Sequence, residues 1–226
     1  MKTPAVRQQR ARKIVSYLKK AYPKPKAELF YTTPFQLVVA VMLSAQCTDK
    51  AVNKVTSGGL FKKYKTPKDF AAAKPEILQK EISSLPFFRN KAKAIIGAAK
   101  IIEKSPPAGG FGGKIPKTVE ELVTLPGVAY KTANVVLGEL YEIWEGIPTD
   151  THVKRFAHRF DLSTNTDLTK ISKDLESLIP KKDWRYVNNG LVLYGRYVCN
   201  ARTHDCSMHP LTKLWPEANK RWFKAK

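Results

Sequence analysis

The chain has 226 residues, and 40 lysines and arginines against 19 acidic residues give it a net charge of +21 at pH 7. Hydrophobic residues make up 43% of the chain, which supports a buried core and excludes a disordered basic tail. The longest apolar run, Leu37 to Leu43, is far shorter than the roughly 20 residues of a membrane span, and no signal-peptide core follows the N-terminus. We therefore expect an intracellular globular protein that binds a polyanion, with nucleic acid the first choice and an anionic membrane surface the second.

The N-terminal segment is strongly basic. Its first 26 residues hold nine basic residues and no acid, which is compatible with a mitochondrial presequence. Ile14, Val15, Leu18 and Tyr22 recur at helical spacing, however, and serine is scarce. We favour a basic surface helix.

The rest of the chain contains repeated signals for helix starts. A capping hydroxyl followed by proline, or by an acid three residues later, is typical of a helix N-terminus. Such signals stand at Thr33-Pro34, before the apolar run Phe35 to Leu43, at Thr66-Pro67 with Asp69, and at Thr118 with Glu121. Thr166 also starts an apolar-periodic segment, with Leu168 and Ile171. Apolar stripes follow them without strand-like alternation, so the sequence predicts an all-α fold with a loop at Ser105 to Gly113.

Residues 118–140, TVEELVTLPGVAYKTANVVLGEL, combine two helices around a very short turn. Pro126 ends the first helix, and Gly127 permits a tight turn with positive φ. The second helix then presents unpaired N–H groups and the positive end of its dipole, which suits a phosphate without reading a base. An ordinary helical corner without function is the plain alternative.

At this point the chain resembles a family. LPGVAYKTANVVL is similar to the helix–hairpin–helix of endonuclease III-type DNA glycosylases. Four further segments resemble that family in the same order, so the resemblance covers nearly the whole chain. They are LSAQCTD (43–49), LPFFRNKA (85–92), TDTH (149–152) and YGRYVCNAR (194–202).

The resemblance implies a two-lobed all-α fold with the active site in the cleft between the lobes. One domain, residues 29–147, would be a six-helix bundle that contains the hairpin at 118–140. The second helical domain would join residues 1–28 to 148–226. Damaged double-stranded DNA is the implied partner, and we expect a monomer.

Lys131 and Asp150 are the candidate catalytic residues. A lysine becomes a nucleophile when its charged form is disfavoured, and a nearby carboxylate can accept its proton. In the family, the lysine at this position attacks C1′ of the damaged nucleotide and forms a Schiff base that leads to β-elimination, assisted by the aspartate. When each residue is considered alone, the simpler interpretation is that Lys131 is a surface lysine that contacts a phosphate and that Asp150 is a helix N-cap.

The resemblance also assigns residues to the DNA. Gln46 would fill the gap left by the extruded nucleotide, and Phe87 would act as the apolar wedge. A polar helix end and a core aromatic are the respective alternatives, and the adjacent Phe88 makes the register of Phe87 ambiguous.

Backbone contacts complete the implied interface. Gly127 and Ala129 belong to the hairpin, His152 follows Asp150, and Arg202 lies in a loop that could touch a phosphate. Many members have glycine where Ala129 stands and a basic residue where Tyr130 stands, so these differences bear on DNA affinity and lesion preference.

The C-terminal region departs further from the family. Most members hold a [4Fe-4S] cluster on four cysteines spaced C-x6-C-x2-C-x5-C, whereas here Cys199 and Cys206 are followed by His209 and Trp215. We therefore expect no cofactor and no [4Fe-4S] cluster. Cys199, His204, Cys206 and His209 have the ligand types of a zinc site, a less favoured alternative because the spacing is unusual.

The function predicted is a bifunctional DNA glycosylase and AP lyase that removes oxidised pyrimidines in base excision repair. The alternatives are a glycosylase for an oxidised purine or a mismatch, and a non-catalytic DNA-binding protein. The expected location is the cytoplasm or nucleoid of a prokaryote, or the nucleus or mitochondrion of a eukaryote.

Overall fold

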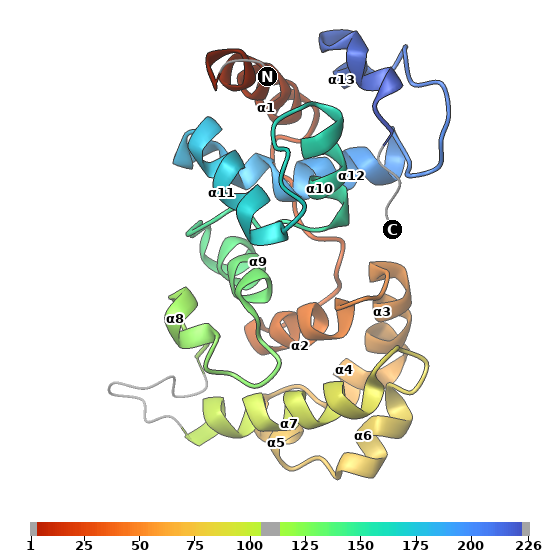
Figure 1. The fold of residues 1–226 in the computed structure, drawn as a ribbon. Helices are drawn as coiled ribbons and strands as arrows, with labels where there is room; N and C mark the ends of the chain where they lie inside the picture. Colours follow the sequence, from red (N-terminus) through yellow and green to blue (C-terminus); the bar gives the residue numbers. More distant parts are fainter. Residues whose placement is uncertain (1–3, 105–113, 223–226) are drawn as a thin grey trace. The chain divides into compact units, whose positions relative to one another are not determined.

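The structure, a computed structural model, describes residues 4–104 and 114–222 (Figure 1). These residues form helices and no strand, which confirms the all-α prediction. The expected loop at Ser105 to Gly113 lies outside the described residues. No helix in the described ranges has both the length and the apolar character needed to cross a membrane.

The chain divides into two compact units. We call Glu28–Ile143 the hairpin unit, and we call Met1–Ala27 together with Trp144–Lys226 the terminal unit. The chain therefore begins and ends in the same unit, in which α1 contacts α11, α12 and α13 (Figure 1).

The hairpin unit is built around one apolar helix. Its elements are α2 (Pro34–Ser44), α3 (Asp49–Val55), the π-helical turn η1 (Thr56–Leu60), α4 (Phe61–Lys63), α5 (Pro67–Ala71), α6 (Pro75–Glu81), α7 (Phe88–Lys104), α8 (Val119–Leu122) and α9 (Tyr130–Tyr141). In α2, every residue from Phe35 to Leu43 is buried, as the apolar run predicted. This helix contacts α3, α7 and α9, and α5 and α6 pack on α7. Burial of apolar surface on α2 therefore stabilises the unit that carries the hairpin.

Local capping explains where these helices begin. The Thr33 hydroxyl accepts the Gln36 N–H at 3.3 Å, and Thr66 forms a complete capping box with Asp69, both as predicted. Thr118 also caps its helix, by accepting the Glu121 N–H at 3.2 Å. The Glu121 carboxylate, however, accepts the Thr118 hydroxyl at 3.1 Å, so the capping box predicted for this pair is not completed.

The terminal unit packs segments from both halves of the chain around a hydrophobic core that includes aromatic rings. Its elements are α1 (Pro4–Ala21), α10 (Thr151–Arg159), α11 (Leu168–Leu178), the 3₁₀ turn η2 (Lys181–Tyr186), α12 (Asn188–Tyr197), α13 (Pro210–Leu214) and the 3₁₀ turn η3 (Pro216–Lys220). Phe156 stacks on Phe160 and meets Tyr194 edge-on, with ring centroids 6.2 and 5.3 Å apart. Helix α11 is capped by Asp167, one residue later than the predicted Thr166, because the Asp167 carboxylate accepts the Lys170 N–H at 2.9 Å.

The N-terminal helix is part of this core, which confirms the helix prediction for that segment. Ile14, Val15 and Leu18 are buried, while the Arg10 guanidinium bonds the Phe160 carbonyl at 2.6 Å and Asp161 at 3.2 Å. Burial opposes ionisation of Asp161, but the hydrogen bond from Arg10 and the nearby arginines hold the pKa of its carboxyl below the usual range. Part of the basic charge of this segment is therefore structural.

Candidate functional site

The hairpin begins with the short helix α8 and turns at Gly127 into α9. Leu125 and Val128 are buried on either side of the turn, and the Val128 N–H donates to the Leu125 carbonyl at 3.0 Å. Gly127 has φ of 78°, the left-handed conformation that the sequence predicted. Ala129 is the exposed N-cap of α9 and, being alanine, supplies no side-chain acceptor for the first N–H groups of that helix.

Gly127 is also required by close packing. A Cβ atom at this position would lie 2.7 Å from the Ala94 Cβ and 3.0 Å from the Met42 Cε. The turn is thus pressed against α7 and α2 where only a hydrogen atom fits. The backbone conformation and the packing both exclude a side chain.

We expect Gly127→Ala to lower the free energy of unfolding by about 1–3 kcal/mol, since it combines positive φ with steric overlap. Urea denaturation measures this, and binding to undamaged duplex reports on the hairpin. Gly58→Ala is the matched control, because a Cβ there meets nothing within 4 Å. Equal unfolding midpoints for the two variants would contradict the packing argument.

Lys131 is exposed and lies in the first turn of α9, at the N-terminal end of the helix that follows the hairpin turn. Asp150 belongs to the terminal unit and is the N-cap of α10. One oxygen of its carboxylate accepts the N–H groups of His152 and Val153, each at 2.9 Å. Asp150 is therefore a helix N-cap, the plain role that the sequence suggested. The pairing of Lys131 with Asp150 stays a prediction.

Gln46 and Phe87 share an unusual backbone feature. Both are exposed non-glycine residues with positive φ, 55° at Gln46 and 58° at Phe87. Phe87 is 59% exposed, whereas Leu85 close by is buried. A core role is thus ruled out for Phe87 within the hairpin unit. Left-handed conformations of such residues cost free energy and are frequent at functional sites.

Lys91 links the segments that carry Gln46 and Phe87, and the sequence did not identify it as a functional residue. Although it is only 8% exposed, its ammonium group donates to the carbonyls of Leu43 and Ala45, each at 2.8 Å. Its own N–H donates to the Phe87 carbonyl at 3.0 Å. Burial holds the pKa of Lys91 below its ordinary value, although nearby Cys47 acts in the opposite direction. One buried lysine thus holds the end of α2, just before Gln46, against the start of α7.

We expect Lys91→Met to lower the free energy of unfolding by about 1.5–3 kcal/mol, because two hydrogen bonds from a charged donor are lost. Urea denaturation tests this, with Lys93→Met, an exposed position on the same helix, as control. If Lys91 positions Gln46, its effect on base release becomes smaller in a Gln46→Ala background. Strictly additive effects in this double-mutant cycle would exclude the positioning role.

The remaining predicted DNA contacts lie in the terminal unit. His152 is held against α12, where a Cβ on Gly195 would collide with its Nδ1. Arg202 is exposed, and its backbone N–H donates to Asn200 at 3.0 Å. That either side chain contacts the DNA backbone stays a prediction.

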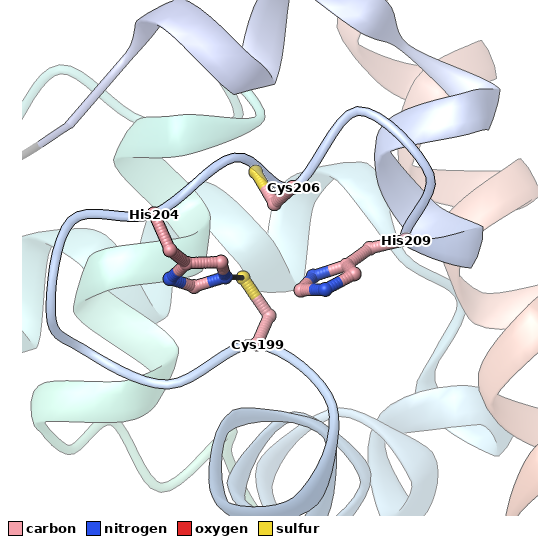
Figure 2. A group of neighbouring side chains, drawn as sticks. All are labelled: Cys199, His204, Cys206 and His209. Atoms are coloured by element: carbon pink, nitrogen blue, oxygen red, sulfur yellow. Dashed lines mark hydrogen bonds between the residues drawn. The ribbon is translucent and has the colours of Figure 1, made fainter.

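The cysteine region corrects one expectation. We expected no cofactor, yet Cys199, His204, Cys206 and His209 each offer a ligand atom, and these atoms all lie within 4.8 Å of one another (Figure 2). The family to which this region is similar holds a metal cluster here, and the chain brings four potential ligands to one place. The prediction of a cofactor-free protein is therefore wrong. The sequence analysis named these four residues only as a less favoured zinc alternative, because their spacing is unusual.

The hairpin and the all-α fold define the class of helix–hairpin–helix DNA-binding proteins. Comparison with known proteins extends this. The family model for the HhH-GPD superfamily of base excision DNA repair proteins matches residues 39–181. Endonuclease III of Synechocystis sp. is 46% identical over 95% of both chains, and that of Bacillus subtilis is 42% identical over 88% of this chain and 89% of its own.

Solved structures agree with the sequence comparisons. A trapped covalent intermediate of endonuclease III with DNA superposes with a TM-score of 0.84 at 37% identity, covering 97% of this chain and 99% of that one. The chain therefore belongs to the endonuclease III family within the HhH-GPD superfamily. This confirms the resemblance drawn from the five sequence segments.

Proposed function

We propose that the protein is a bifunctional DNA glycosylase and AP lyase of base excision repair, with Lys131 as its nucleophile and oxidised pyrimidines as its substrates. The observation that carries this proposal is the exposed Lys131 in the first turn of α9, directly after the Gly127 turn. The match to a trapped covalent endonuclease III–DNA intermediate supports a covalent route. The bacterial relatives fit an enzyme that meets DNA in the cytoplasm.

In the proposed reaction, the neutral Lys131 amine attacks C1′ of the damaged nucleotide, and the glycosidic bond breaks with its electron pair going to the base. The nitrogen then loses a proton, and the C1′–O4′ bond breaks while O4′ takes up a proton, which gives the open-chain Schiff base. Removal of a C2′ proton then expels the 3′ oxygen, which cleaves the strand by β-elimination. Water hydrolyses the Schiff base and regenerates the lysine.

The carboxylate of Asp150 would assist by accepting a proton or by stabilising positive charge on the sugar. Its N-cap hydrogen bonds fix the orientation of the carboxylate while occupying one oxygen. We propose that Lys131 of the hairpin unit and Asp150 of the terminal unit act on the same nucleotide.

We further propose that the DNA is held without reading its sequence. The N-terminal end of α9 would bind a phosphate, and Gln46 and Phe87 would enter the duplex where the nucleotide has left. His152 and Arg202 would contact the backbone. The net charge of +21 provides the salt-dependent part of the affinity.

Borohydride trapping tests this proposal. The wild-type protein should form a covalent adduct with duplexes that contain thymine glycol or an abasic site, and should cleave them without a metal cofactor added to the assay. Preference for 8-oxoguanine or for a mismatch would replace the oxidised-pyrimidine assignment. Binding to all duplexes with neither base release nor an adduct would instead show a non-catalytic DNA-binding protein.

A further inference from the structure

Four potential metal ligands converge in the loop between α12 and α13. Cys199 follows α12, His204 and Cys206 lie in the loop, and His209 immediately precedes Pro210, the first residue of α13 (Figure 2). Both cysteines are buried, at 1% and 0% exposure. The four ligand atoms lie within 4.8 Å of one another although they come from a segment of only eleven residues.

The ring of His204 is oriented as it is in metal sites. Its Nδ1 lies 2.7 Å from the Arg202 carbonyl, so Nδ1 carries the proton that it donates there. The other ring nitrogen, Nε2, faces the Cys199 sulfur at 3.9 Å. A tetrahedral zinc ion with its usual bond lengths sets sulfur and nitrogen ligands about 3.6 Å apart. A backbone carbonyl that fixes the second nitrogen of a histidine is a common outer-shell contact of bound zinc.

His209 provides a second, independent observation, because one of its ring nitrogens, Nδ1, is buried without a hydrogen-bond partner within the described structure. A turn, in which the His209 N–H donates to the Cys206 carbonyl at 3.0 Å, brings these two side chains to one side. A buried ring nitrogen without a partner costs free energy, and a metal ion among the four ligands would satisfy it.

Arg159 gives the two sulfurs a positively charged neighbour. Its guanidinium, which is 1% exposed, donates to the Cys199 sulfur at 3.0 Å and to the Cys206 sulfur at 2.7 Å. It also donates to the Ala218 carbonyl at 2.8 Å and lies 4.1 Å from the Trp222 ring, so its position is fixed. Hydrogen bonds to the ligand atoms are outer-shell contacts of the kind that orient metal ligands.

We propose that Cys199, His204, Cys206 and His209 bind one Zn²⁺ ion as a closed structural site. Two thiolates and two imidazoles are a zinc ligand set, whereas a [4Fe-4S] cluster on four cysteines requires four thiolates. The close grouping of all four ligand atoms fits one ion better than a cluster with two or more metals. Because the protein fills all four positions, the ion would fix the loop and take no part in the reaction.

Metal analysis of the purified full-length protein is the first test. Cells are grown with both zinc and iron, and no chelator is used in purification. We expect one zinc per chain, and we expect Co²⁺ added to metal-free protein to give the absorption of a tetrahedral thiolate site. Protein without bound metal, in which Arg159 alone neutralises the sulfurs, would overturn the proposal, and so would iron with acid-labile sulfide.

Thermal unfolding, first of the wild-type protein, is the second test. Removing zinc with a chelator should lower the melting temperature by ~5 °C or more, and adding zinc back should restore it. His209→Ala should lose the bound zinc and the response to chelator. Cys47→Ser, which removes a cysteine outside the set, should keep both. An unchanged melting temperature after chelation of the wild type would refute a structural zinc.

Discussion

Replacing Lys131 by alanine is expected to abolish the covalent protein–DNA adduct and to slow strand cleavage by roughly 10³-fold or more. The amine is the group that attacks C1′, and no Schiff base forms without it. Since the residue is exposed at the start of α9, its loss should leave folding intact. Borohydride trapping and single-turnover cleavage of a thymine glycol duplex measure the two effects.

Two control variants separate this chemistry from simple electrostatics. Lys131→Arg keeps the positive charge beside the hairpin but cannot form the Schiff base, so it should bind DNA and still fail to trap. Lys68→Ala removes an exposed lysine of α5 in the same unit and should keep wild-type trapping. If Lys131→Arg cleaves as well as wild type, Lys131 is a phosphate contact and the proposed nucleophile is wrong.

Local sequence signals predicted the helix starts because caps act over three residues. Thr33, Thr66 and Thr118 each bond a backbone N–H three positions later, and such contacts are independent of the tertiary fold. The buried face of α2 was equally predictable from its unbroken apolar run. The one-residue error at α11 arose because Thr166 and Asp167 are both good caps.

Tertiary contacts between distant residues were not predictable in this way. Lys91 reads as one of 40 basic residues, yet it bonds a carbonyl 48 positions earlier in the chain. Arg159 similarly meets sulfurs 40 and 47 positions away. A periodic pattern gives no sign that a charged side chain is buried, because its partners are backbone carbonyls or cysteines from other segments.

The four potential metal ligands illustrate why an irregular spacing is hard to interpret from sequence. The set Cys199, His204, Cys206 and His209 departs from familiar zinc patterns, and only the fold of the loop brings the four atoms together. The orientation of His204 depends on the Arg202 carbonyl, a backbone atom that sequence does not reveal. Replacing thiolates by imidazoles thus need not end metal binding.

Asp150→Asn is expected to slow base release and strand cleavage by roughly 10²–10⁴-fold while leaving stability nearly unchanged. Asparagine caps a helix about as well as aspartate, so the bonds to the His152 and Val153 N–H groups can persist. The substitution removes the carboxylate charge that would accept a proton or stabilise the sugar. Single-turnover kinetics and urea denaturation of the same variant measure the two properties.

The matched control is Asp167→Asn, because Asp167 caps α11 in the same unit by accepting the Lys170 N–H at 2.9 Å. Both variants replace a capping aspartate, so any effect on folding should be similar for the two. Only Asp150→Asn should lose activity if its carboxylate serves Lys131. Equal, full activity of both variants would reduce Asp150 to a helix cap and leave the proposed reaction without its carboxylate.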